Sequence, residues 1–98
     1  MLSVQWRPVP GYAGFYEVSD EGEVYSLGRP KTRGGLLRVH VNPQGYRFVR
    51  LYRYGQIKSV TVARLVLLTF RGPPEHGQRA RHGAGGPLDD RLGNLYWG

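Results

Sequence analysis

The run of residues 45–62 constrains the fold of this chain more than any other stretch. Its β-branched and aromatic residues are interrupted at Tyr54-Gly55, a pair typical of a tight turn between antiparallel strands. The run therefore predicts a β-hairpin. Side chains alternate across a strand, so the first strand presents two mixed faces: Arg47, Val49, Leu51 and Arg53 on one, and Tyr46, Phe48, Arg50 and Tyr52 on the other.

The segment that follows has the pattern of a helix. Apolar and small side chains recur at i, i+3, i+4 and i+7 across residues 62–70, and Gly72-Pro73-Pro74 is a strong stop signal. We predict one amphipathic helix over residues 63–71.

The remaining elements are predicted to be short strands. A Ser-Asp-Glu-Gly turn flanked by residues 15–19 and 23–27 predicts an N-terminal hairpin. We predict a third strand at residues 36–41 and a further strand at residues 79–82, which ends at His82. The expected class is α+β, with antiparallel hairpins and one helix. The side chains expected to be largely buried are Trp6, Tyr16, Val18, Val24, Leu65, Phe70, Leu95 and Trp97.

The positive charge is concentrated in the middle of the chain. Residues 29–81 hold twelve cations against one acid, whereas residues 1–28 and 82–98 are each net negative. Twelve of the fourteen cations are arginine, which suits bidentate phosphate contacts. This distribution favours double-stranded DNA as partner over a merely solubilising surface. The candidate DNA-binding residues are Arg47, Arg50, Arg53, Lys58, Arg64, Arg71, Arg79 and Arg81.

Several classes of site are excluded or unsupported. The chain has no cysteine, which excludes disulfides and cysteine-based zinc sites, and its three histidines lack a zinc spacing. A metal, if bound, is expected to be a hard cation held mainly by oxygen. No apolar run approaches the ~20 residues of a membrane span, and no signal-peptide layout precedes the first hairpin. We therefore expect a cytoplasmic protein without a membrane partner.

The last twenty residues carry a candidate catalytic pattern. His82 precedes a glycine-rich loop, an Asp89-Asp90 pair follows, and Asn94 leads into Leu-Tyr-Trp. Phosphodiester hydrolysis needs a general base and a divalent cation, and an imidazole can be that base near neutral pH. The loop lets the chain return, so that Asn94 could orient the ring by a hydrogen bond.

These residues resemble a known family. Arg81-His82, Asp89-Asp90-Arg91-Leu92 and Asn94-Leu95-Tyr96-Trp97 are similar to the core of phage and intron-encoded HNH homing endonucleases, which reads N-H-x-D-G, then N-N, then N-L-x-W. Residues 6–27 resemble the nuclease-associated module that precedes such cores. Residues 62–70 resemble the family pattern V-H-R-L-V-x-x-x-F, with Ala63 in place of the histidine. The resemblance covers nearly the whole chain.

The resemblance implies a fold, a reaction and roles. It implies a nuclease-associated module at residues 1–45 and a partial HNH core at 46–98, with the ββ part of a ββα-metal fold. His82 corresponds to the general base, Asn94 to the residue that positions it, and Asp89 and Asp90 are candidate ligands for Mg²⁺.

Two departures leave activity open. Asp90 replaces a usual asparagine, and the family's metal-ligand helix would follow Gly98. Two functions compete: a metal-dependent DNA endonuclease, impaired without that helix unless a further chain or protein partner completes the core, or a catalytically inactive DNA-binding or protein-inhibiting module.

Overall fold

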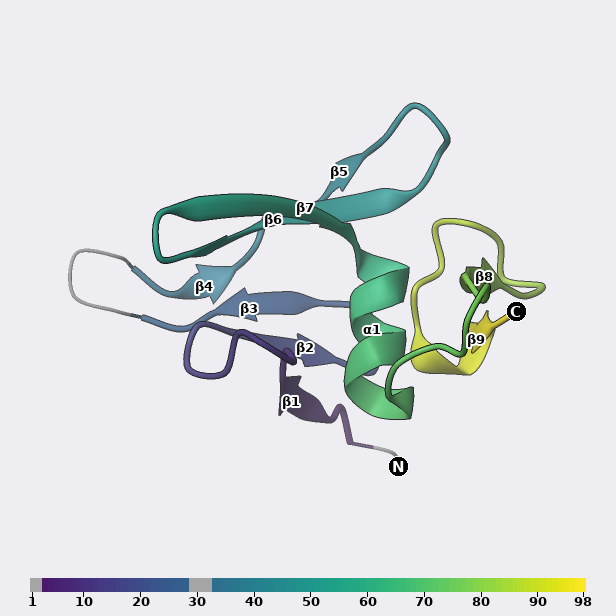
Figure 1. The fold of residues 1–98 in the computed structure, drawn as a ribbon, viewed down its shortest axis with the longest axis horizontal. Coiled ribbons are helices and arrows are strands. Elements are labelled where there is room, and N and C mark those ends of the chain that lie inside the picture. Colours follow the sequence, from purple (N-terminus) through teal and green to yellow (C-terminus); the bar gives the residue numbers. More distant parts are fainter. Residues whose placement is uncertain (1–2, 29–32) are drawn as a thin grey trace.

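The computed structural model describes residues 3–28 and 33–98, and in them the chain is a mixed α+β fold of antiparallel sheets around one helix (Figure 1). A four-stranded sheet has the order β1-β2-β3-β4, and a three-stranded sheet has the order β5-β6-β7. A two-stranded sheet pairs β8 with β9. The bounds are β1 Trp6–Pro8, β2 Tyr16–Ser19, β3 Val24–Ser26, β4 Gly35–Leu36, β5 His40–Val41, β6 Arg47–Arg53, β7 Gln56–Thr61, α1 Val62–Arg71, β8 Ala80–His82, η1 Leu92–Asn94 and β9 Leu95–Trp97.

The central hairpin forms as predicted. β6 and β7 pair antiparallel down to Arg53 and Gln56, and the turn residues Tyr54 and Gly55 have φ values of 51° and 77°. These left-handed values match the twist of a two-residue hairpin turn. One face of β6 enters the core through Val49 and Leu51, which are fully buried, whereas Arg50 and Tyr52 on the other face are exposed.

Helix α1 is confirmed and lies at the centre of the molecule (Figure 1). The hydroxyl of Thr61 accepts a hydrogen bond from the Arg64 backbone at 3.4 Å, and Gly72 ends the helix with a φ of 83°. The helix packs against strands of all three sheets, so its buried face is wider than the predicted stripe. Its buried residues are Val62, Ala63, Leu65, Val66 and Leu67, whereas Phe70 is only partly buried.

The N-terminal hairpin is confirmed as β2 and β3, but the expected burial of Trp6 is wrong. Trp6 lies in the edge strand β1, keeps 38% of its surface exposed, and packs edge-on against Tyr25. An edge strand has a neighbour on one side only, and β1 is exposed along its length. Trp97 is partly buried against the core, and the other expected core residues, apart from Phe70, are buried.

The single strand expected at residues 36–41 is also wrong. The segment forms two short strands, β4 and β5, which belong to different sheets. β4 pairs with β3 of the N-terminal sheet, and β5 pairs with β6. The chain therefore passes from one sheet to the other within this segment. The same two sheets are also joined elsewhere, because the hydroxyl of the buried Tyr16 accepts a hydrogen bond from the Tyr52 backbone N–H at 2.9 Å.

The C-terminal hairpin has the predicted form. β8 pairs with β9, so that His82 stands opposite Leu95 at the end of the ladder. The loop between them, residues 83–94, lies beside α1 (Figure 1). Among the described residues, no helix is long and apolar enough to span a membrane.

Candidate active site

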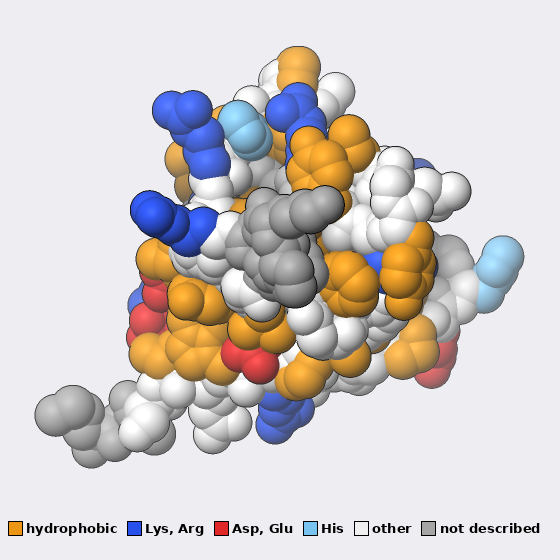
Figure 2. Space-filling view, turned by 90° about the vertical axis from the view of Figure 1, so that its left-hand side faces the viewer, with side chains coloured by type: hydrophobic (Ala, Val, Ile, Leu, Met, Phe, Trp, Pro, Cys, Tyr) orange, Lys and Arg blue, Asp and Glu red, His pale blue; other side chains and the backbone are white. Residues whose placement is uncertain are grey.

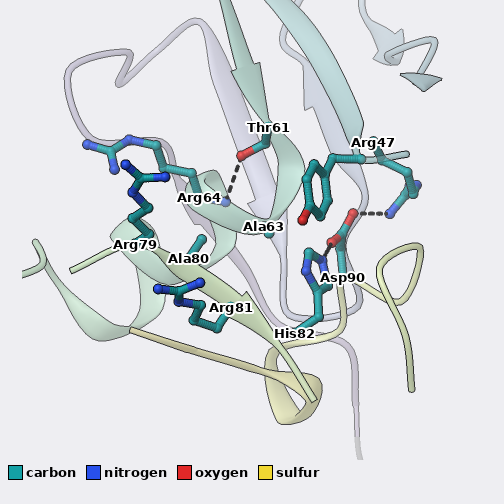
Figure 3. A pocket seen from close by; sticks show the side chains of 10 residues that line it. Arg47, Thr61, Ala63, Arg64, Arg79, Ala80, Arg81, His82 and Asp90 are labelled. Carbon is teal, nitrogen blue, oxygen red and sulfur yellow. Dashed lines mark hydrogen bonds and ion pairs between the residues drawn. The ribbon is translucent and has the colours of Figure 1, made fainter. Parts of the chain in front are cut away.

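A buried carboxylate lies at the centre of the candidate site. Asp90 is 2% exposed, and its two oxygens have different partners (Figure 3). Oδ1 lies 2.7 Å from Nε2 of His82, and Oδ2 accepts a hydrogen bond from Nη1 of Arg47 at 2.9 Å. A buried carboxylate needs such partners to compensate for lost hydration. The result is an Arg47, Asp90 and His82 array, which we call the Asp90 array.

The array determines which imidazole nitrogen is basic. An ionised carboxylate only accepts hydrogen bonds, so Nε2 of His82 must carry the proton that Asp90 accepts. In a neutral ring, Nδ1 is then the nitrogen with a free lone pair. Tyr46 stacks on the same ring, with centroids 5.7 Å apart and planes at 11°. The imidazole ring of His82 is therefore held on its face by Tyr46 and at its Nε2 edge by Asp90.

Asn94 occupies a different position from the one expected. Its side-chain NH₂ donates to the carbonyls of Asp89 and Gly86 at 2.8 and 3.2 Å, and its oxygen accepts from the Gly85 backbone at 2.9 Å. It thus holds the loop after His82 closed, whereas Asp90 makes the hydrogen bond to the ring. A Cβ on Gly85 would clash with the Asp89 carboxylate and lie 3.0 Å from Asn94, so this clamp favours glycine.

Asp89 is engaged with its neighbour. Arg91 donates to both of its carboxylate oxygens at 2.9 and 2.8 Å. The hydrogen bond from Arg91 is the main cause that lowers the pKa of Asp89 from 3.8 to about 2. A depressed pKa means that the pair stabilises the fold above about pH 3.8, and this contribution is lost as the pH falls towards about 2.

The donor set does not fit a divalent cation as it stands. Both oxygens of Asp89 face Arg91, and those of Asp90 face Arg47 and His82. No group of three or more metal-ligating acidic or histidine side chains gathers within residues 3–28 and 33–98. A hard cation would require rearrangement of these pairs or oxygen ligands from other groups.

The candidate DNA-binding cations fall into two groups. Arg47, Arg64, Arg79 and Arg81 line a cavity of about 300 Å³ together with His82 and Asp90 (Figure 3). The other group lies away from this cavity and consists of Arg50, Arg53 and Lys58 on the central hairpin and Arg71 at the end of α1. On the face seen in Figure 2, basic and hydrophobic side chains are intermixed instead of forming a continuous basic patch.

Sequence reasoning missed two contributors to the site. Tyr46 supplies the stacking ring, and the N-terminal hairpin supplies the Gly22 carbonyl, which accepts from Nη2 of Arg47 at 3.3 Å. Gly22 has a φ of 85°, and an added Cβ would lie 2.9 Å from the Asp90 carbonyl oxygen. The one signal in the sequence is Asp90 itself, because a carboxylate in place of an asparagine requires a cationic partner when it is buried.

Comparisons with known proteins identify relatives of this chain. A family model described as the NUMOD4 motif matches residues 5–52. DNA endonuclease I-HmuI of Bacillus phage SP01 is 34% identical over 94 residues, which are 96% of this chain and 52% of that enzyme.

A solved structure described as DNA binding and cleavage by the HNH homing endonuclease I-HmuI matches with a TM-score of 0.84 at 33% identity. The match covers 96% of this chain and 52% of that one, so the chain spans about half the length of its relative. The predicted resemblance is confirmed: the chain is a homologue of the HNH homing endonuclease I-HmuI and carries a NUMOD4 motif.

Proposed function

We propose that this chain binds double-stranded DNA and contributes the general-base half of an HNH endonuclease site. The observation that carries the proposal is the Asp90 array, which holds His82 at the edge of an arginine-lined cavity. The relationship to an enzyme whose solved structure is described as DNA binding and cleavage supports it.

The residues of the array have separate roles in this proposal. His82 accepts a proton from water at Nδ1, and Asp90 stabilises the imidazolium that results. Arg47 holds Asp90 in place and balances its charge before the proton moves. Asn94 keeps the loop closed, so its role is to position the segment that carries Asp90.

A divalent metal would supply further chemistry to such a site. In HNH chemistry Mg²⁺ stabilises the departing oxygen. The described donors do not fit a cation as they stand, so Asp89 and Asp90 could serve as ligands only after rearrangement of their ion pairs. A further chain or protein partner that supplies ligands would complete the site.

The alternative is a catalytically inactive module that binds DNA or inhibits a protein. The pairing of Asp89 with Arg91 and of Asp90 with Arg47 favours it, because both carboxylates are held by arginines. Arg81, which precedes the base, also has no lone pair for a metal. DNA binding is shared with the first proposal, whereas cleavage separates the two.

DNA binding is expected to depend steeply on salt. The log-log slope of affinity against salt should be about −0.9 per phosphate neutralised, and similar for unrelated duplexes. Replacing Arg50 and Lys58 together by alanine should make the slope shallower by about one for each of the two cations that binds a phosphate. Arg53 is less suitable for this test, because its guanidinium donates to the Gly11 carbonyl and lies over Tyr12. A flat slope, or no binding at ~50 mM salt, would contradict this prediction.

Plasmid nicking by the 98-residue chain is expected to be absent in magnesium or manganese. The physical reason is that the nearby carboxylates are engaged by arginines, and metal assistance contributes several kcal/mol to such reactions. Appending a family-like C-terminal helix should restore cleavage. Magnesium-dependent nicking by the chain itself, lost in His82→Ala and kept in the exposed control His76→Ala, would show that the prediction is wrong.

A further inference from the structure

Three arginines of the cavity form no ion pair with an acidic side chain of the described residues. These are Arg64, Arg79 and Arg81, whereas Arg47 is paired with Asp90. All three are exposed, and Figure 3 places them on one side of the cavity, opposite the Asp90 array. Guanidinium groups gathered in this way repel one another unless an anion lies among them.

The start of α1 opens into the same cavity. Thr61, Ala63 and Arg64 line it, and the first turn of the helix carries no acidic residue. The first backbone N–H groups of a helix lack partners within the helix and carry a partial positive charge. The Arg64 backbone N–H already donates to the Thr61 hydroxyl, so a small anion placed here can receive guanidinium hydrogen bonds and those of the other N–H groups of the first turn.

The three guanidinium groups differ in the contacts that they already make within the protein. Arg81 donates from Nε to the Gly98 carbonyl at 3.1 Å, and Arg64 lies over the Trp97 ring at 5.8 Å. The ring contact orients Arg64 without using its N–H groups, which remain free to donate. Arg79 stands at the start of the C-terminal hairpin, where its backbone pairs with Gly98, and its side chain forms no ion pair with a described residue.

We propose that the cavity at the start of α1 is a phosphate subsite, which takes one nucleic-acid backbone phosphate without a metal ion through Arg64 and Arg79. The subsite deepens the DNA-binding function proposed above and rests on it for the identity of the ligand. The subsite places a phosphate in the cavity that His82 also lines. Guanidinium and helix N–H groups then balance the negative charge of that phosphate.

The test measures binding of inorganic pyrophosphate in EDTA by calorimetry and by backbone amide NMR. We expect saturable binding, with the largest amide shifts at residues 62–64 and 79–82. Arg64→Ala with Arg79→Ala should weaken affinity at least about tenfold, the effect of losing charge-assisted hydrogen bonds. Arg33→Ala with Arg38→Ala removes the same charge from exposed positions outside the cavity and should change affinity by less than about twofold at physiological salt.

Three results would overturn the subsite: binding that requires magnesium, equal weakening in both double variants, or amide shifts centred elsewhere. Thermal unfolding checks that each variant is folded, and Arg64→Gln with Arg79→Gln replaces the alanine pair if it is not. Because the assay contains no DNA, the two proposals fail separately. Duplex DNA that does not bind while pyrophosphate does would reject only the proposed function, and the reverse would reject only the subsite.

Discussion

Replacing Asp90 by alanine is expected to cost the fold about 3–5 kcal/mol, the usual loss when one partner of a buried ion pair is removed. The side chain of Asp90 is 1% exposed, and those of Arg47 and His82 are only 23% and 10% exposed. Without the carboxylate, a guanidinium and an imidazole N–H face each other with little water to compensate. Urea unfolding of the purified variant measures the loss.

Two further variants make this prediction specific. Asp90→Asn should be less damaging than Asp90→Ala, because the amide oxygen can still accept from Nε2 of His82 while the ion pair with Arg47 is lost. Asp89→Ala removes a carboxylate whose partner Arg91 is largely exposed, and should have a much smaller effect. A cost below ~1 kcal/mol for Asp90→Ala would mean that water reaches the array.

Replacing Leu65 by alanine is expected to cost about 2–5 kcal/mol, the range for deleting a buried leucine side chain. Leu65 is 2% exposed and belongs to the helix that packs against all three sheets. Because its surroundings are held by several elements, they cannot easily move in to fill the cavity that the substitution leaves. Urea unfolding again measures the effect. The matched control is Leu88→Ala, in the loop and 56% exposed, which should change stability by less than ~0.5 kcal/mol. A loss below ~1 kcal/mol for Leu65→Ala would contradict the assigned buried face.

Local patterns predicted most of the elements. The alternation around Tyr54-Gly55, the helical spacing before Gly72 and the short run ending at His82 each depend on residues that are neighbours in the chain. Strand and helix periods arise from backbone geometry, so they can be read without knowing what the element packs against. The division at residues 45 and 46 stays a prediction, although Arg47 already connects the Asp90 array to Gly22.

Burial at the edges could not be predicted in this way. A large aromatic residue such as Trp6 is expected in the core, but its exposure depends on its strand being the outer one of the sheet. The same limit applies to residues 36–41, where pairing with β3 at one end and with β6 at the other divides one apolar run into two strands. Strand order depends on contacts between distant segments, which no local pattern contains.

The sequence by itself determined the homing-endonuclease relationship, the hairpins, the helix and His82 as the candidate base, because motif spacing and periodicity are properties of short segments. Only the tertiary structure decided which groups surround that base. Arg47 lies 43 positions from Asp90 in the chain, yet its guanidinium pairs with the buried Asp90 carboxylate and also donates to the carbonyl of Gly22. The physical reason is that burial removes water from Asp90, so its charge must be balanced by whichever cation the packed sheets and helix bring within hydrogen-bond distance.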